Sequence, residues 1–201
     1  MIDMIHEEDI KRTKGRKIKR LDLFASAQWV KSGKILAHPT ESIWGLGCDA
    51  FKEKSVNKIF DLKKRDNKKN FILLADSIDS VEKELCDLSQ SEKKYLQNYW
   101  PGPFTFLINY REDIPRHLKN ETKKIAIRVS NHLPLKLLFK KFSGFMISTS
   151  ANISGQKNIN DPQDILNIFE YDELAYYDET LGKNESPSQI IDLETKRIIR
   201  E

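Results

Sequence analysis

The sequence predicts an α/β protein in which a single sheet is flanked by helices. Short apolar segments alternate with amphipathic segments through most of the chain, and this alternation is typical of strands and helices layered around one core. The strand candidates are apolar at almost every position, as expected for strands that are covered on both faces. At 201 residues the chain has the length of one domain, or of one domain with a short appendage.

The first half of the chain follows this alternation. Helical spacing of apolar residues from Leu21 to Val30 predicts a helix that Gly33 ends. A strand candidate at 34–38 and another at 71–75 enclose an amphipathic helix over about 54–64. Two more helices are predicted near 78–85 and 91–99.

The second half repeats the pattern after a break. The segment Trp100-Pro101-Gly102-Pro103 must end any helix. Asp161 followed by Pro162 is a favourable N-cap and first residue for a helix over 162–169. The remaining candidates are strands at 104–109, 125–129, 145–148, 188–192 and 197–200, and a helix at 133–142.

Composition excludes several classes of protein. The chain is 39% hydrophobic and 32% charged, with 8 Gly and 7 Pro, which excludes collagen-like and low-complexity chains. No apolar run approaches the roughly 18 residues that span a bilayer, so we expect no membrane partner. The two cysteines, Cys48 and Cys86, form neither a disulfide framework nor a zinc site. We therefore expect a reducing, cytoplasmic location.

The net charge of +4 is unevenly distributed. Residues 1–20 hold 7 basic and 4 acidic side chains, whereas the rest holds 27 and 26 and is nearly neutral. We therefore divide the chain into a basic N-terminal extension, residues 1–20, and a folded domain, residues 21–201. Residues 52–69 carry 8 basic and 3 acidic side chains, which fits either an attraction for phosphate-bearing ligands or a solvated helix face.

Three places break the local pattern, and such breaks are expected at functional sites. The first is His38-Pro39-Thr40-Glu41-Ser42 followed by Trp44-Gly45-Leu46-Gly47. Here we expect a loop whose glycines allow close backbone approach and whose N–H groups cradle an anion. The alternative is an ordinary turn in which Thr40 or Ser42 is a cap.

The second break follows the helix over 54–64. Lys63 continues the apolar stripe of that helix, so it either reaches past the core to solvent or points to an inward site. Arg65 comes next with a planar fork suited to phosphate or carboxylate. The alternative is a set of cations that complements the helix dipole.

The third break combines two strand candidates. Arg128 lies within an apolar strand and needs an anionic partner from the protein or from a ligand. Ser148, Thr149, Ser150 and Asn152 cluster at the carboxyl end of another buried strand, where ligands bind in open α/β sheets. The alternatives are a helix cap and a structural ion pair.

Common fingerprints are absent from the sequence. It contains no GxGxxG, no GxxxxGK[ST] and no GxSxG. The four histidines have no metal-ligand spacing with one another or with the cysteines. We therefore predict no protein-held metal site.

In combination, these motifs resemble the YrdC/TsaC family of threonylcarbamoyl-AMP synthases, and the compact length resembles the bacterial TsaC type. The resemblance spans about residues 21–200. The chain departs at His38, where members often carry a tyrosine, and at Asp66, where a proline is frequent. The matching segments are Pro39-Thr40-Glu41 with Trp44-Gly45-Leu46-Gly47, Lys63-x-Arg65, Trp100–Thr105, Ile125–Val129, Ser148–Gly155 and Pro187–Asp192.

The resemblance implies a YrdC-like, dsRNA-binding-domain-like fold: a twisted mixed sheet flanked by helices, with a concave basic cleft. It implies that L-threonine, bicarbonate and ATP give threonylcarbamoyl-AMP and pyrophosphate, with Mg²⁺ accompanying ATP. A partner complex would then transfer the threonylcarbamoyl group to adenosine 37 of tRNA, and a direct tRNA contact stays open.

The resemblance also implies roles for individual residues. Lys63 and Arg65 would be catalytic through their contacts with the triphosphate. The implied threonine site is Thr40, Arg128 and Ser148, the implied ATP site is Arg65, Lys69, Ser150 and Asn152, and Ser188 is a candidate at the cleft edge. The alternatives are an RNA-binding module without adenylation, a carbamoyl-adenylate domain like that of hydrogenase maturation proteins, and an inactive relative.

Overall fold

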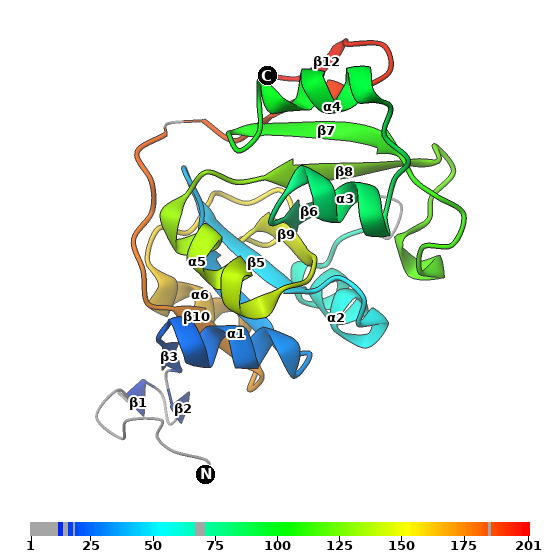
Figure 1. The fold of residues 1–201 in the computed structure, drawn as a ribbon. Coiled ribbons are helices and arrows are strands. Elements are labelled where there is room, and N and C mark those ends of the chain that lie inside the picture. The colour runs from blue at the N-terminus through cyan, green and yellow to red at the C-terminus, as the bar shows by residue number, and fades with distance from the viewer. Residues whose placement is uncertain (1–11, 14–15, 18, 67–70, 185) are drawn as a thin grey trace.

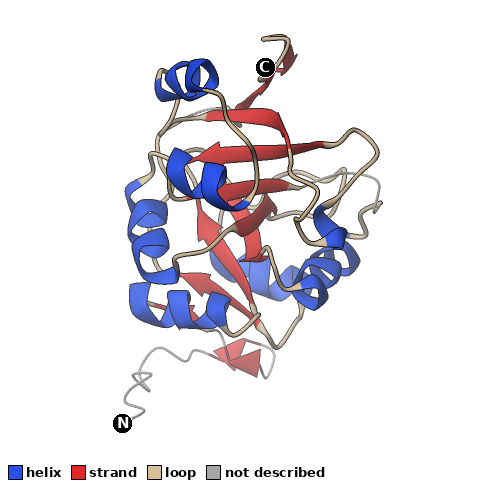
Figure 2. Cartoon of the chain, turned by 45° about the vertical axis from the view of Figure 1, so that its right-hand side comes forward, coloured by secondary structure: helices blue, strands red, loops and turns tan. Residues whose placement is uncertain are grey.

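The computed structural model describes residues 12–13, 16–17, 19–66, 71–184 and 186–201. Ten strands form one mixed sheet in the order β12-β11-β7-β8-β6-β9-β5-β4-β10-β3. The strands run through the middle of the molecule, with helices on either side (Figure 2). This confirms the predicted fold class.

The helices agree with the sequence to within a few residues. The predicted N-cap Asp161 accepts a hydrogen bond from Gln163 N, and Asp22, which was not predicted, caps the first helix by accepting one from Ala25 N. The helices are α1 (Leu23–Lys31), α2 (Glu53–Lys63), α3 (Ile78–Glu84), α4 (Gln90–Gln97), the short 3₁₀ helix η2 (Arg116–Leu118), α5 (Leu133–Phe142) and α6 (Pro162–Phe169).

Most strands also lie where the apolar segments predict them. β1 (Arg12–Thr13) and β2 (Arg16–Lys17) pair with each other, outside the main sheet. β3 pairs with β10, so the sheet already includes Arg20. The strands of the main sheet are β3 (Arg20–Leu21), β4 (Ile35–Pro39), β5 (Trp44–Asp49), β6 (Ile72–Ala75), β7 (Phe104–Asn109), β8 (Lys124–Val129), β9 (Met146–Ser150), β10 (Leu174–Tyr177), β11 (Gln189–Asp192) and β12 (Ile198–Arg200).

The loop predicted after Thr40 is wrong from Trp44 onward, because this segment is β5 in the interior of the sheet. Its glycines are needed for packing. A Cβ atom on Gly45 would lie 2.7 Å from His38 Cε1, and one on Gly47 would lie 2.6 Å from Met146 Cε. Side chains of the neighbouring strands fill this face of β5.

The sequence does not predict β10 as a strand. Its four residues lie between two pairs of acidic residues.

Two hydrophobic clusters lie on opposite faces of the sheet. On one face, α2, α3, α4 and α6 pack against buried residues such as Phe106, Ile127 and Ile147. On the other face, α1 and α5 pack against each other and cover Leu36 and Met146. Figure 1 shows α1 and α5 side by side over β5 and β10, at some distance from β7 and β12.

The sheet is therefore covered on both faces only in part. On the face of α1 and α5, the register aligns Ile72 with Ala126 and with Ser148 across three neighbouring strands. These side chains border a cavity and not a helix. The predicted cover on both faces is wrong for this half of the sheet, because α1 and α5 do not extend over β7, β8 and β11.

Candidate functional site

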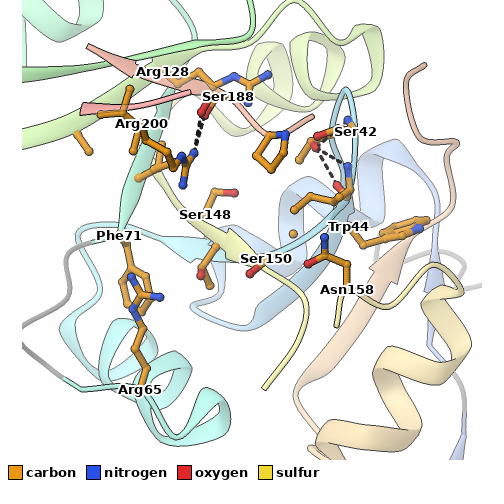
Figure 3. A pocket seen from close by; sticks show the side chains of 18 of the residues that line it. Ser42, Trp44, Arg65, Phe71, Arg128, Ser148, Ser150, Asn158, Ser188 and Arg200 are labelled. Carbon is orange, nitrogen blue, oxygen red and sulfur yellow. Dashed lines mark hydrogen bonds between the residues drawn. The ribbon is translucent and has the colours of Figure 1, made fainter. Parts of the chain in front are cut away.

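The uncovered half of the sheet forms the floor of a cavity of about 410 Å³, a volume within the range of small-molecule sites. In Figure 3, Arg65 with Phe71 lies on one side, Arg128 and Arg200 lie on the other, and Ser148 and Ser150 lie between them. The lining residues are Thr40, Ser42, Ile43, Trp44, Gly45, Arg65, Phe71, Ile72, Leu107, Ala126, Arg128, Ser148, Thr149, Ser150, Asn158, Pro187, Ser188, Ile190 and Arg200.

The strand register explains why these side chains meet. Arg128 is opposite Leu74, and Ser148 is opposite Gly47, so both point to the face of α1 and α5. Ser150 is two residues after Ser148 and points the same way. Because the sheet is mixed, these residues meet on a sheet face, not at the carboxyl edge that we expected from open parallel sheets.

Arg128 has a protein anion as its partner. Its Nη2 lies 2.5 Å from Glu41 Oε2 in an ion pair with little exposure of either side chain. Glu41 Oε1 also accepts hydrogen bonds from Ser130 Oγ at 2.8 Å and from Asn131 N at 3.2 Å. Burial raises the pKa of Glu41, but Arg128 and Ser130 outweigh it and hold the pKa below its usual value. Glu41 is therefore ionised at neutral pH.

Thr40 lines the cavity but also caps its own turn. Its Oγ1 donates to Ile43 O at 2.7 Å and accepts from Ser42 N and Ile43 N. This is the local hydroxyl turn that the sequence offered as the alternative to an anion-binding loop. The turn joins β4 to β5 and places Glu41 beside β8.

Ser148 is linked to a buried histidine. Its Oγ lies 3.2 Å from Nε2 of His38 on β4. Burial lowers the pKa of His38 to about 4, with a contact to Pro39 O acting in the opposite direction. The imidazole is therefore neutral at pH 7.

Lys63 lies at the end of α2 and is 1% exposed. Its Nζ donates to the carbonyl oxygens of Ser150 and Asn152, and to Asn152 Oδ1 at 3.3 Å. Burial, and then the charge of Arg65, lower its pKa to about 8. Lys63 is not among the residues that line the cavity, and its ammonium holds the end of β9 and the residues that follow it.

Arg65 comes into the cavity because α2 ends sharply. Lys64 adopts a left-handed conformation with φ 50°, and this turn carries Arg65 over the ring of Phe71, 5.1 Å from its centroid. Burial lowers the pKa of Arg65, although a guanidinium keeps its charge at neutral pH.

Arg200 on β12 is a functional candidate that the sequence analysis missed. Its Nη2 donates to Ser188 O at 2.7 Å and lies 3.4 Å from Ser188 Oγ. Ser188 Oγ is in turn 2.8 Å from Thr105 Oγ1. Burial, and then the charge of Arg128, lower the pKa of Arg200.

The structure brings most of the predicted residues to one cavity. Thr40, Arg65, Arg128, Ser148, Ser150 and Ser188 line it. Asn152 stands behind Ser150, accepts from its Oγ at 2.5 Å and donates to Gln156 O. Lys69 lies outside the described residues. Among those residues, no group of three or more His, Cys, Asp or Glu side chains is placed to hold a metal ion.

Glu41 and Arg200 were not assigned from the sequence. Glu41 could have been noticed as the carboxylate next to Thr40 in the predicted turn. Its partner Arg128, however, is 87 residues away in the chain. The sequence carries almost no signal for Arg200, because a short terminal strand rich in cations is typical of an exposed edge.

None of the described helices is long and apolar enough to cross a membrane.

Comparison with known proteins finds relatives that match over most of the chain. A family model for Sua5, YciO and YrdC, described as "Telomere recombination", matches residues 28–201. A threonylcarbamoyl-AMP synthase of Acinetobacter baumannii is 38% identical over 181 residues, covering 87% of this chain and 95% of that protein. The enzyme of that name from Saccharophagus degradans is 38% identical over 168 residues, covering 84% and 88%.

Solved structures share the fold. P. abyssi Sua5 complexed with L-threonine superposes with a TM-score of 0.78 at 26% identity, covering 88% of this chain and 54% of that one. This chain therefore spans about half of that Sua5 chain. E. coli YciO superposes with a TM-score of 0.78 at 22% identity, covering 92% and 94%, and shows the common fold alone.

Proposed function

Because the chain belongs to the Sua5/YciO/YrdC family, we propose that it is a threonylcarbamoyl-AMP synthase that converts L-threonine, bicarbonate and ATP to threonylcarbamoyl-AMP and pyrophosphate. It is thus an enzyme of the nucleotidyltransferase type. The observation that carries the proposal is the cavity of about 410 Å³, which combines three guanidinium groups with the hydroxyls of β9, of the turn between β4 and β5, and of Ser188.

The reaction requires positioning and charge neutralisation more than covalent help from the protein. The amine of threonine and bicarbonate form a carbamate with loss of one water molecule, and a carbamate oxygen attacks the α-phosphorus of ATP. A P–O bond to the carbamate forms as the bond to the leaving pyrophosphate breaks. Cations near the phosphates stabilise the charge that develops, and fixed reactants avoid an entropic cost.

The arginines fit these anions by type and position. Arg65 and Arg200, on two sides of the cavity, would bind the phosphates of ATP. Arg128 would bind the carboxylate of threonine and share its charge with Glu41. Ser148 and Thr40 complete the proposed threonine site, with Ser188 at its edge, and Ser150 lies toward ATP.

Lys63 and Asn152 would act mainly by holding the wall of this site. The Lys63 ammonium binds the backbone of Ser150 and Asn152. A direct contact of Lys63 with the triphosphate stays a prediction. For this contact, the Lys63 ammonium would have to exchange a backbone carbonyl oxygen for a phosphate oxygen. Asn152 fixes the Ser150 hydroxyl that would contact ATP. The roles of Lys69 and the basic extension 1–20 stay predictions as well.

Mg²⁺ would enter with ATP. The cavity lining offers cations and hydroxyls, so the phosphates themselves would supply most of its ligands. The product would pass to a complex that transfers the threonylcarbamoyl group to tRNA, and we place the protein in the cytoplasm because ATP and tRNA are found there. An RNA-binding module without adenylation is not favoured, because a cavity of about 410 Å³ fits a nucleotide and an amino acid better than a duplex.

The test is pyrophosphate release by the purified protein with ATP and Mg²⁺, with and without L-threonine and bicarbonate. We expect release only when both are present. Release that ignores L-threonine would indicate another substrate. Salt-sensitive binding of tRNA without any release would instead support the RNA-binding reading.

A further inference from the structure

His38 lies beside the cavity floor, on the same face of the sheet as Ser148, and the mechanism above leaves it without a role. It is on β4 with 0% exposure, and its Nε2 lies 3.2 Å from Ser148 Oγ. The glycines of β5 make room for the ring: a Cβ on Gly45 would lie 2.7 Å from Cε1, and one on Gly47 would lie 3.0 Å from Cδ2. The imidazole is thus buried over the glycines of β5, and its hydrogen bond to Ser148 links it to the cavity.

The surroundings of the ring select one tautomer. Nδ1 lies 3.4 Å from the carbonyl oxygen of Pro39. A carbonyl oxygen can only accept, so this contact is favourable when Nδ1 carries the ring proton. Burial keeps the ring neutral at pH 7 by lowering the pKa of His38. Nε2 then carries a lone pair, and Ser148 donates its hydroxyl proton to it.

A hydroxyl whose proton is committed in this way presents only oxygen lone pairs to the cavity. The charged side chains that line the cavity are Arg65, Arg128 and Arg200. A guanidinium donates hydrogen bonds but accepts none. These groups suit carboxylate and phosphate. The amino group of an amino acid needs an acceptor, and Ser148 provides one in the middle of the floor (Figure 3).

We propose that His38 is a positioning residue that orients the Ser148 hydroxyl as a hydrogen-bond acceptor for the amino group of the substrate amino acid. This inference rests on the proposed function. Ser148 contacts the amino group, whose nitrogen becomes carbamoylated. His38 does not touch the substrate and acts by orienting Ser148.

The variants His38→Phe and His38→Gln separate hydrogen bonding from packing. Phenylalanine keeps an aromatic ring but cannot accept the Ser148 proton, whereas the glutamine amide oxygen can. We expect His38→Phe to raise KM for L-threonine about fivefold to tenfold, the worth of one hydrogen bond, with KM for ATP unchanged. His38→Gln should restore most of the loss. His117→Phe is the matched control, because His117 contacts Ala50 O and borders a different cavity.

Ser148→Ala tests whether His38 acts through Ser148. In that background His38→Phe should have no further effect on KM for L-threonine. Additive effects, or equal increases in KM for ATP and L-threonine, would overturn the proposal and assign His38 a packing role.

Nitrogen NMR of the His38 ring tests the tautomer without turnover or substitution. The proposal requires a protonated Nδ1 and an unprotonated Nε2 at pH 7, and the opposite tautomer would overturn it. Because this measurement needs no activity, it separates the two hypotheses. If the wild-type protein releases no pyrophosphate, the proposed function fails even where the tautomer is as expected. If release is normal and the tautomer is wrong, only the role of His38 fails.

Discussion

Arg65 is one of the three guanidinium groups that line the cavity. It follows the end of α2 and lies over the ring of Phe71, at the rim of the core. We expect Arg65→Ala to reduce pyrophosphate release at least tenfold, since a charged hydrogen bond to phosphate is worth roughly 1.5–3 kcal/mol. The melting temperature should stay close to that of the wild type.

The matched control is Lys54→Ala, which removes an exposed cation from the same helix. Its turnover should equal that of the wild type. An equal loss in both variants would indicate that general positive charge near α2 matters, and turnover unchanged in Arg65→Ala would remove the proposed role of Arg65.

His38 makes a second prediction at the residue scale, which concerns stability and pH. Burial lowers its pKa from 6.5 to about 4; the contact with Pro39 O and the charge of Glu41 oppose this shift, and the charges of His132 and Arg128 add to it. The unfolded chain therefore binds a proton below about pH 6.5 that the folded chain does not bind. By linkage, His38 alone should lower the free energy of unfolding by about 3 kcal/mol between pH 7 and pH 4.

Urea denaturation at several pH values checks this prediction, with His38→Gln as the comparison. The variant should lose less stability than the wild type over the same pH range. Parallel curves for the two proteins would show that His38 titrates normally and is not held neutral by the fold.

At the scale of elements, one ion pair ties the turn between β4 and β5 to the end of β8. Glu41 binds Arg128, Ser130 and Asn131 from this turn. Glu41→Gln keeps an acceptor for the two neutral donors but leaves the buried guanidinium uncompensated. We expect a loss of about 3 kcal/mol in the free energy of unfolding.

Chemical denaturation measures this loss, and Glu112→Gln is the control. Glu112 pairs with Lys119 and Lys123 on the exposed surface, where ion pairs contribute little. Its substitution should not change the unfolding midpoint. An equally small effect of Glu41→Gln would mean that solvent or an ion replaces the lost carboxylate at Arg128.

β5 shows where sequence-based reasoning about elements fails. Trp44, Leu46 and Cys48 alternate with glycines and an aspartate, but glycine is depleted in strands and usually indicates a turn. The reason for Gly47 lies in other strands, since Met146 and the carbonyl of Ile147 occupy the space of its Cβ. Helices such as α5 and α6 were predictable because their signals are local: apolar spacing, caps and proline.

Gly47→Ala tests this explanation. The new Cβ would lie 2.6 Å from Met146 Cε and 2.7 Å from Ile147 O, and we expect a loss of about 1–3 kcal/mol in unfolding free energy. Met146→Ala combined with Gly47→Ala should stay less stable than Met146→Ala alone, because the backbone carbonyl cannot move aside. Equal stability of those two variants would leave only the side-chain contact as the cause.

The site follows the same rule as the elements. Arg128 and Ser148 were predictable because a charge or a hydroxyl within an apolar strand is anomalous on its own. Glu41 reaches Arg128 from the turn that joins β4 to β5. Arg200 reaches the cavity because β12 pairs with β11. Contacts between residues so distant in the chain leave no local pattern.

At the scale of the whole molecule, the helices cover one face of the sheet and half of the other, and ligands would complete the uncovered half. A ligand that binds only the folded state stabilises it, by about 2.7 kcal/mol at a hundredfold excess over its Kd. We therefore expect ATP with Mg²⁺ to raise the melting temperature, and Arg65→Ala to lose most of this increase.

Chelation by EDTA separates a metal that enters with the nucleotide from one that holds the fold. The described residues include no cluster of three acidic, histidine or cysteine side chains for a structural ion, and the cavity is lined by arginines. EDTA should therefore stop pyrophosphate release and remove the stabilisation by ATP, while the ligand-free protein keeps its melting temperature. Added Mg²⁺ should restore both. A lower melting temperature of the ligand-free protein in EDTA would instead show that the protein holds an ion of its own, and the proposal that ATP brings Mg²⁺ to the cavity would be wrong.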